Sequence, residues 1–218
     1  MKKKIGVVLA GCGVFDGSEI HETVITLLAI DRNGSEAICM APDMALDEVD
    51  HLTGQPTGAK RNVLSESARI ARGKIKDIAE VNAADLDAII FPGGFGAAKN
   101  LCTFVSKGPD ATIQPDVVRL LKEMAAAKKP IGAICIAPAL IAVALGSEYA
   151  PQLTIGSDAG TAAAINATGS SHISCSVRDI FVDEKNRIVS TPAYMLAERI
   201  SEAAEGIEKL VNAVCKLI

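Results

Sequence analysis

The sequence predicts an α/β fold, with a doubly wound, mostly parallel sheet covered by helices on both faces as a three-layer sandwich. Short apolar runs alternate with longer helical patterns along the 218 residues, which is typical of βαβ units. Apolar residues make up 49% of the chain, only 3% of residues are aromatic and tryptophan is absent, which favours helices packed on a buried parallel sheet. No linker, repeat or low-complexity segment interrupts this pattern, so we expect a single domain over residues 1–218.

Apolar periodicity and turn residues divide the first half of the chain into elements. They predict a strand over 4–10, a helix over 18–34, a strand over 36–42, a loop-rich segment over 43–60, a helix over 61–73 and a strand over 86–94. Ser18 is the expected N-cap of the first helix, and Gly34 is expected to end it. The strand over 86–94 runs into a Pro-Gly-Gly turn.

The second half continues the alternation. It predicts a helix over 114–129, a strand over 131–134, a helix over 137–146, a strand over 153–157, a hairpin over 179–193 and an amphipathic helix over 195–217. The hairpin is expected to turn around Asp183 to Asn186, and a longer loop remains an alternative there.

Composition excludes several classes of function. The formal net charge is −4 and no basic cluster is present, so we expect no nucleic-acid partner. No segment approaches the ~20 apolar residues of a membrane span, and the basic start is followed by too short an apolar run for a leader. We therefore expect a soluble, cytoplasmic protein that does not associate with a membrane.

The cysteines and histidines do not have the spacing of a metal site. The six cysteines form no Cys-x-x-Cys pair, and only three histidines accompany them. Without a secretion signal these cysteines are expected to be reduced thiols, each of which could be a small buried hydrophobe. The sequence predicts neither a metal nor another cofactor.

Cys135 stands at a joint between the strand over 131–134 and the helix over 137–146. Ligands of doubly wound sheets bind beyond the carboxyl ends of the strands, so a residue at this joint is expected to face a crevice. Small neighbours such as Gly132 and Ala133 allow a sharp turn, similar to a nucleophile elbow. The helix N-terminus is expected to lower the pKa of the thiol. An inert thiol buried at a strand end is the alternative.

Several motifs, in order along the chain, resemble one superfamily. "FPGGFGAAKNL" and "IGAICIAPAL" are similar to the paired signatures of the ThiJ/PfpI superfamily, which has the flavodoxin-like, class I glutamine amidotransferase-like fold. "GCGVFDGSEIHE", "PGGFGAAKNL", "LTIGSD" and "TPAYMLAE" resemble its enhancing-lycopene-biosynthesis (ElbB) subfamily, also called isoprenoid biosynthesis proteins with an amidotransferase-like domain. The likeness covers nearly the whole chain.

The resemblance implies a catalytic site. It implies that Cys135 is a nucleophile and that Glu22, in "HETVITLL", is its carboxylate partner. The backbone N–H groups of Gly94 and Ile136, with Gly93 in the same turn, would bind an oxyanion or the substrate. Glycine in a strand-to-loop turn has the simpler explanation of a positive φ.

Periodicity alone gives a different position for Glu22. The apolar stripe of residues 18–33 centres on Ile20, Val24, Leu27 and Leu28. Glu22 lies roughly opposite this stripe, which predicts exposure to solvent. The resemblance instead implies that burial beside Cys135 raises the pKa of Glu22.

Departures from the superfamily's other branches narrow the expected activity. Amidotransferases of this fold use a late His-x-Glu-type motif, whereas His172 is followed by "ISC". Peptidases of the superfamily place histidine directly after the cysteine, where this chain has Ile136. What remains resembles the glutathione-independent glyoxalases, which are lyases converting glyoxal to glycolate, or methylglyoxal to lactate, through a cysteine hemithioacetal. Activity on protein adducts would be observed as deglycase activity.

Some assignments stay open. Glyoxalases of this type often have an additional histidine, but His21 is expected at the surface or rim and His172 has no assigned place. Without that group catalysis is expected to be slow. Asp16, Ser18 and Glu19 either line the crevice or form a turn and a charged first helical turn.

Two alternative functions do not involve catalysis. One is an oxidative-stress sensor or regulator acting through a peroxide-reactive cysteine, linked to isoprenoid biosynthesis. The other is a scaffold whose dimer surface matters more than its crevice. A homodimer is expected from the resemblance in any case.

Overall fold

The central element of the structure is a mostly parallel sheet. The computed structural model describes residues 2–218, and within them the sheet has seven strands. In spatial order these are β10 (Phe181–Asp183), β11 (Ile188–Thr191), β7 (Ile131–Ile134), β6 (Ala88–Phe91), β1 (Lys4–Val8), β2 (Glu36–Ala41) and β5 (Lys76–Asp77). Neighbouring strands are parallel except β10 and β11, which form the predicted hairpin. The predicted fold class is confirmed.

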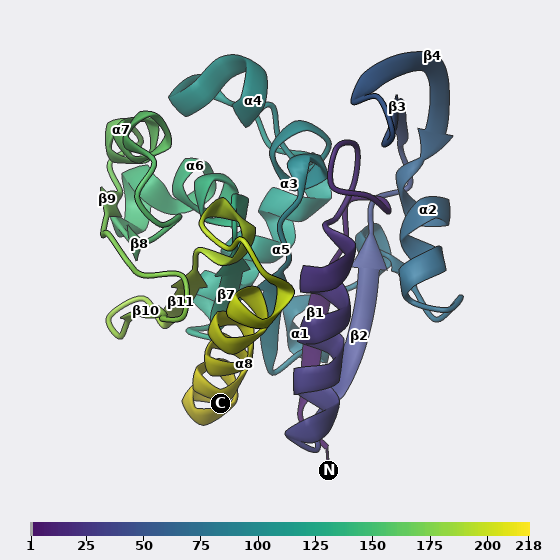
Figure 1. Ribbon diagram of the computed structural model, residues 1–218. Helices are drawn as coiled ribbons and strands as arrows, with labels where there is room; N and C mark the ends of the chain where they lie inside the picture. The colour runs from purple at the N-terminus through teal and green to yellow at the C-terminus, as the bar shows by residue number, and fades with distance from the viewer. Residues whose placement is uncertain (1) are drawn as a thin grey trace.

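Helices cover both faces of this sheet (Figure 1). The helices are α1 (Ile20–Arg32), α2 (Val63–Ile70), α3 (Phe95–Lys99), α4 (Phe104–Lys107), α5 (Pro115–Ala126), α6 (Ala137–Tyr149), α7 (Ala159–Ala167) and α8 (Ile200–Leu217). The core with α1 and α8 lies on one face, and the core with α5 and α6 lies on the other. The apolar runs of β1, β6 and β7 are buried between these cores, as expected for strands covered on both sides.

The segment 43–60 is not a loop, so that prediction is wrong. It contains β3 (Ala45–Asp50), which pairs in antiparallel fashion with β4 (Gln55–Asn62). This hairpin projects from the sheet beside α2 (Figure 1). Nearly all of β4 is exposed, so its residues show no alternation of apolar and polar side chains. A polar segment rich in turn residues has the sequence pattern of a loop.

Several element boundaries differ from the prediction. Glu19, not Ser18, is the N-cap of α1, because the Ser18 hydroxyl instead accepts a hydrogen bond from the Ala10 N–H at 2.8 Å. Gly34 follows the helix with φ of 70°, as predicted. Of the strand predicted over 153–157, only Leu153 is in β8 (Gln152–Leu153), which pairs with β9 (Ser171–His172).

The C-terminal helix begins later than predicted. A 3₁₀ turn, η4 (Ala193–Met195), follows β11 and occupies the region where the helix was expected to start. The helix α7 was not predicted, because its run of small residues has no clear apolar stripe. Among the described residues, no helix has both the length and the apolar character of a membrane span.

Candidate active site

The candidate site lies where the chain connections of the sheet diverge. From β1 the chain leads to β2 on one side, and β6 lies on the other side of β1. The segments that follow β1, β6 and β7 therefore meet at the carboxyl edge of the sheet, where open α/β sheets bind ligands. Cys135 follows β7, Gly93 and Gly94 follow β6, and Glu22 lies in the first turn of α1 after β1.

Cys135 occupies a strained turn between β7 and α6. Its φ is 62°, in the left-handed region that a residue with a side chain rarely adopts. The surrounding fold fixes the turn, and the Cys135 N–H donates to the carbonyl oxygen of Thr191 at 2.9 Å. The side chain is 8% exposed and faces a cavity. The turn thus has the predicted form of a nucleophile elbow.

The turn after β6 requires two glycines. Gly94 has φ of 91°, and a Cβ on it would lie 2.4 Å from the Glu19 nitrogen. A Cβ on Gly93 would lie 2.4 Å from the Cys135 Cβ and 2.7 Å from a carboxylate oxygen of Glu22. Such distances exclude any side chain, so glycine here brings the backbone of β6 against the cysteine and the glutamate.

Glu22 is fully buried beside Cys135. Its Oε2 accepts the Gly93 N–H at 2.9 Å, its Oε1 accepts the Tyr194 N–H at 3.2 Å, and its carboxyl group is hydrogen-bonded to the Cys135 thiol. The solvent-exposed position that periodicity predicts for Glu22 is therefore wrong. The position implied by the family resemblance agrees with the structure.

Three of the four residues of the predicted apolar stripe of α1 face outward, contrary to the prediction, and the fourth, Leu27, is partly buried against the core. Ile20, Val24 and Leu28 are 42%, 49% and 44% exposed, whereas Thr23 and Thr26 are buried with Glu22. The threonine hydroxyls donate to backbone carbonyls of their own helix, Thr23 to Glu19 and Thr26 to Glu22. Because such bonds satisfy the polar groups internally, the buried face of this helix can be polar.

The protonation of the pair differs from the sequence-based expectation. Burial, followed by repulsion from Glu19, raises the pKa of Glu22 to about 8. Burial and the neighbouring Glu22 raise the pKa of Cys135 well above its ordinary value, although the N–H groups of Gly94 and Ile136 act in the opposite direction. The predicted lowering of the pKa of Cys135 is therefore wrong. The pair cannot carry two negative charges, so a proton stays with it.

Gly93 has a different role from Gly94 and Ile136. The N–H of Gly93 donates to Glu22, so it orients the carboxylate and is not free to bind a substrate oxygen. The N–H groups of Gly94 and Ile136 point at the Cys135 sulfur, and both residues line the cavity. The structure thus corrects the assignment of Gly93 as an oxyanion or substrate donor.

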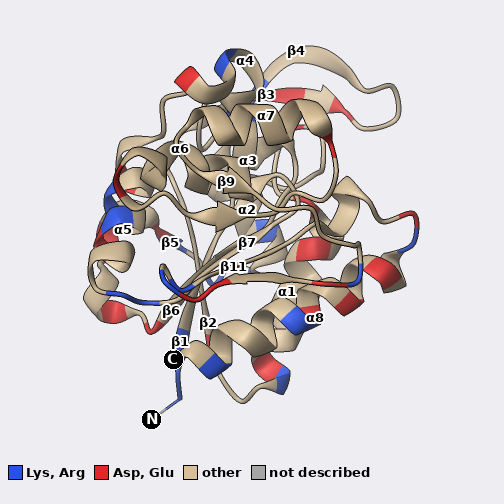
Figure 2. Cartoon of the chain, turned by 90° about the vertical axis from the view of Figure 1, so that its left-hand side faces the viewer, with Lys and Arg blue, Asp and Glu red and all other residues tan. Residues whose placement is uncertain are grey.

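The cavity beside Cys135 is small and mostly apolar. It encloses about 280 Å³ and is lined by Val14, Glu19, Gly94, Phe95, Cys135, Ile136, Thr161, Tyr194 and Met195. No lysine or arginine is among these lining residues of the described chain. Helices α6 and α7, which flank the cavity, carry few charges, as Figure 2 shows. The cavity therefore suits a small neutral ligand and does not favour an anion.

The structure also places the residues whose roles were left open. Glu19 lines the cavity, whereas Asp16 and Ser18 stabilise the loop after β1 through bonds to the backbone of Val49 and Ala10. His172 accepts the Ile155 N–H and does not line the cavity.

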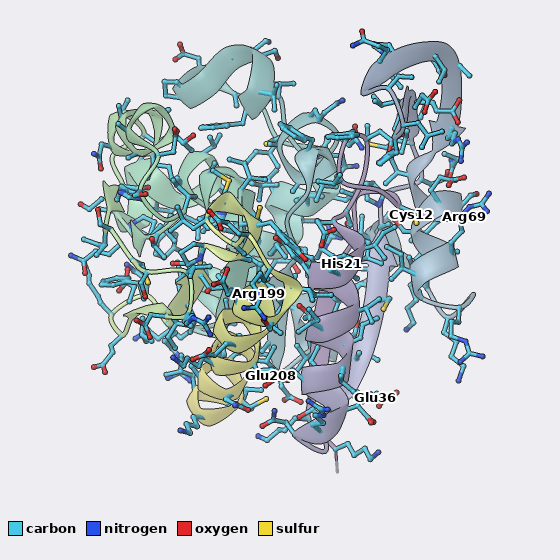
Figure 3. The ribbon with its side chains drawn as sticks, in the orientation of Figure 1. Cys12, His21, Glu36, Arg69, Arg199 and Glu208 are labelled. Carbon is cyan, nitrogen blue, oxygen red and sulfur yellow. The ribbon has the colours of Figure 1, made fainter. Side chains whose placement is uncertain are left out.

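Tyr194 lines the cavity and was not identified from the sequence. Its hydroxyl is hydrogen-bonded to Nδ1 of His21 at 2.8 Å. His21 is exposed, as predicted, and lies near the start of α1 (Figure 3). Tyr194 lies in "TPAYMLAE", a motif that carries the family resemblance, and that motif was the available signal.

The fold and the Cys135–Glu22 pair define the class of protein. The model of the DJ-1/PfpI family matches residues 12–155, and the chain belongs to this family. The chain is 46% identical over 225 residues to human glutamine amidotransferase-like class 1 domain-containing protein 3, mitochondrial, covering 98% of this chain and 83% of the human protein. It is 44% identical over 227 residues to the rat ES1 protein homolog, mitochondrial, covering 99% of this chain and 84% of that protein.

A solved structure agrees with the subfamily resemblance. The crystal structure of an isoprenoid biosynthesis protein with an amidotransferase-like domain from Ehrlichia chaffeensis superposes with a TM-score of 0.92 at 35% identity, and covers 99% of this chain and 100% of that one. The names of the human and rat relatives place those proteins in mitochondria. This finding contradicts the cytoplasmic location expected from the sequence.

Proposed function

We propose that the protein is a cofactor-independent glyoxalase that converts glyoxal to glycolate, and methylglyoxal to lactate. The observation that carries this proposal is the buried Cys135–Glu22 pair, which opens into a small cavity without cationic side chains. A thiol with a carboxyl group in hydrogen-bonding contact supplies a nucleophile and a base at one place. The same chemistry on dicarbonyl adducts of proteins would be observed as deglycase activity.

The first step is addition of the thiol to one aldehyde. The ionised Glu22 takes the Cys135 proton, and the sulfur electron pair forms a bond to the carbonyl carbon. The oxygen that becomes negative lies within reach of the Gly94 and Ile136 N–H groups, which have no carboxylate partner. Each such donor typically lowers a barrier by ~3 kcal/mol. Glu22 then returns the proton to this oxygen, giving the hemithioacetal.

The second step moves hydrogen between the two carbons. Glu22 removes the C–H proton of the hemithioacetal carbon, the released electron pair forms an enediol, and the proton returns to the neighbouring carbon. The product is a thioester of Cys135, an isomer of the hemithioacetal, so no external oxidant or reductant is needed. Hydrolysis of this thioester releases the 2-hydroxy acid and the thiol.

The raised pKa of Glu22 suits a group that both removes and returns protons. A pKa of about 8 lies near neutral pH, where both protonation states are populated. A carboxyl group with its ordinary pKa of 4.5 would be a weaker base by more than three units. Burial of Glu22 thus supports its assignment as the acid and base of the reaction.

Glycolate formation from glyoxal tests the proposal. We expect wild-type protein to form glycolate, and both Cys135→Ala and Glu22→Gln to lose at least ~10²-fold in kcat. Cys175→Ser and Glu36→Gln are matched controls, because Cys175 lies outside the cavity and Glu36 is an exposed residue of β2. Both controls should retain wild-type activity.

Two outcomes would contradict the proposal. Undiminished turnover by Cys135→Ala would remove the proposed nucleophile. Absence of turnover by wild-type protein, together with stoichiometric oxidation of Cys135 by peroxide, would favour the sensor.

A further inference from the structure

The proposed reaction needs an acid that the Cys135–Glu22 pair does not supply. When Glu22 removes the C–H proton, negative charge develops on the oxygen of the second carbonyl, which needs a proton at that moment. The Gly94 and Ile136 N–H groups point at the sulfur, so they serve the first carbonyl oxygen. A second acid must therefore come from another part of the cavity wall.

Three lining residues besides Cys135 carry polar side chains: Glu19, Thr161 and Tyr194. Glu19 caps α1, because its Oε2 accepts the Glu22 N–H at 2.7 Å. Thr161 is bound through its backbone and its side chain to Asp158, the N-cap of α7. Both are engaged in holding helix termini, which leaves the phenol of Tyr194.

Tyr194 is held at both of its ends by adjacent residues of one helix. Its backbone N–H donates to Glu22 Oε1 at 3.2 Å, and its hydroxyl is bonded to His21 Nδ1 at 2.8 Å. The rings of Tyr194 and His21 lie 5.8 Å apart between centroids, inclined by 47°. Since Glu22 and Tyr194 are joined directly, the phenol has a fixed position relative to the base.

His21 connects the tyrosine to solvent. Tyr194 is half-buried in the cavity wall, and His21 is exposed near the start of α1 (Figure 3). The chain of groups from the cavity through the phenol to the imidazole thus ends in water. An imidazole ring can donate a proton from one nitrogen while its other nitrogen accepts one, so it can reprotonate a phenolate formed in the cavity.

We propose that Tyr194 is a catalytic acid at the second carbonyl oxygen, and that His21 is a positioning residue that returns a proton to Tyr194 from solvent. This inference rests on the proposed glyoxalase function.

The proton transfers balance. As Glu22 takes the C–H proton, the C–H electron pair forms the carbon–carbon double bond, and the carbonyl π pair takes the Tyr194 proton. The phenolate recovers a proton from His21 Nδ1, and the His21 ring is reprotonated by water. Glu22 then protonates the second carbon, and the first hydroxyl releases its proton to solvent, which makes up for the proton that water supplied through His21, so that the thioester forms with no net change in protons.

The state of Tyr194 agrees with this role. Burial, together with Glu19 and Glu22, raises the pKa of Tyr194, so the phenol keeps its proton at neutral pH and can donate it. The aromatic ring also forms part of the cavity wall, so substitution by phenylalanine removes the hydroxyl and leaves the ring and the backbone bond to Glu22 in place.

Tyr194→Phe tests the assignment. We expect glycolate formation to fall by ~10²-fold in kcat, with a small change in KM, because proton transfer by a positioned group contributes about this factor. Tyr149→Phe, the change at the other tyrosine of the chain, is the matched control and should have wild-type activity, since Tyr149 lies outside the cavity.

Trapping experiments identify the affected step. Glyoxal should still add to Cys135 in Tyr194→Phe, as a mass increase on the peptide that contains this cysteine. Hydroxylamine, which converts only a thioester to a hydroxamate, should yield product with wild-type protein and little with the variant. Loss of the Cys135 adduct itself in Tyr194→Phe would place the residue in the wrong step and overturn the inference.

His21 is tested by rescue. His21→Ala should lower kcat by ~10-fold, and added imidazole should restore it, which a purely structural contact would not allow. No rescue would overturn the relay. If wild-type protein and Tyr194→Phe convert glyoxal equally well, the role of Tyr194 is wrong and the proposed glyoxalase function stands. If wild-type protein does not turn it over, the proposed function fails.

Discussion

Glu22→Gln replaces a carboxyl group whose ionisation the fold resists, and its effect on stability should depend on pH. The pKa of Glu22 rises from its ordinary value of 4.5 to about 8 on folding, because the group is buried and lies near Glu19. Between these two values the folded protein holds a proton that the unfolded chain has released. The free energy of unfolding therefore falls by ~1.4 kcal/mol for each unit by which the pH rises. Below pH 4.5, the pKa of Glu22 in the unfolded chain, the protonated group contributes its full stabilisation.

Chemical unfolding of wild-type protein and Glu22→Gln across pH measures this effect. From about pH 5 to about pH 8, stability of the variant should increase relative to wild type by roughly 4 kcal/mol, since glutamine does not titrate. The amide can accept only one of the two backbone N–H groups that Glu22 accepts, so the variant loses about one hydrogen bond at every pH. That offset is constant and leaves the difference in slope intact.

An exposed carboxylate provides the control. Glu36→Gln, in β2, should follow the wild-type pH dependence, because Glu36 is exposed in the folded protein. If the stability of Glu22→Gln and that of wild type change in parallel over the whole range, Glu22 ionises normally in the folded state. The account of a proton shared with Cys135 would then be wrong.

Two further predictions concern residues of the site. Glu19→Gln removes a negative charge that raises the pKa of Glu22. In a plot of kcat/KM against pH, activity should therefore begin to rise at a lower pH in this variant than in wild type. An unchanged profile would contradict the repulsion between Glu19 and Glu22. Gly93→Ala should lose activity, because the new Cβ would lie 2.4 Å from the Cys135 Cβ. Gly160→Ala is the control and should be active, since its new Cβ would lie 3.6 Å from the nearest side-chain atom. Equal activities of the two variants would contradict the close packing of Gly93 against Cys135.

The sequence was sufficient for six of the seven strands of the sheet, all except β5, and for its longer helices, because their signals are local. The apolar runs of β1, β6 and β7 are buried on both faces, and turns follow them directly. The hairpin of β3 and β4 had no such signal, since most of its residues are exposed and it is held by pairing between strands.

The site residues differ in how far local reasoning could place them. The turn at Cys135 follows from a strand and a helix that are adjacent in sequence, so the elbow could be predicted. The position of Glu22 depends on the first turns of α1 burying polar side chains, and a helical wheel predicts the opposite. Only the motif resemblance implied the buried position. The pKa of Cys135 could not be predicted, because it depends on burial and on a carboxyl group 113 residues away in the chain (135 minus 22).

The most direct test of the central claim is to locate the first covalent bond between glyoxal and the protein. Wild-type protein should be mixed with glyoxal, quenched within the first turnover and mapped by peptide mass spectrometry. The account predicts a mass increase at Cys135 ahead of the other five of the six cysteines, and its loss as glycolate appears. Glycolate formation with Cys135 unmodified throughout, or a productive adduct at another thiol such as Cys12, would contradict the account.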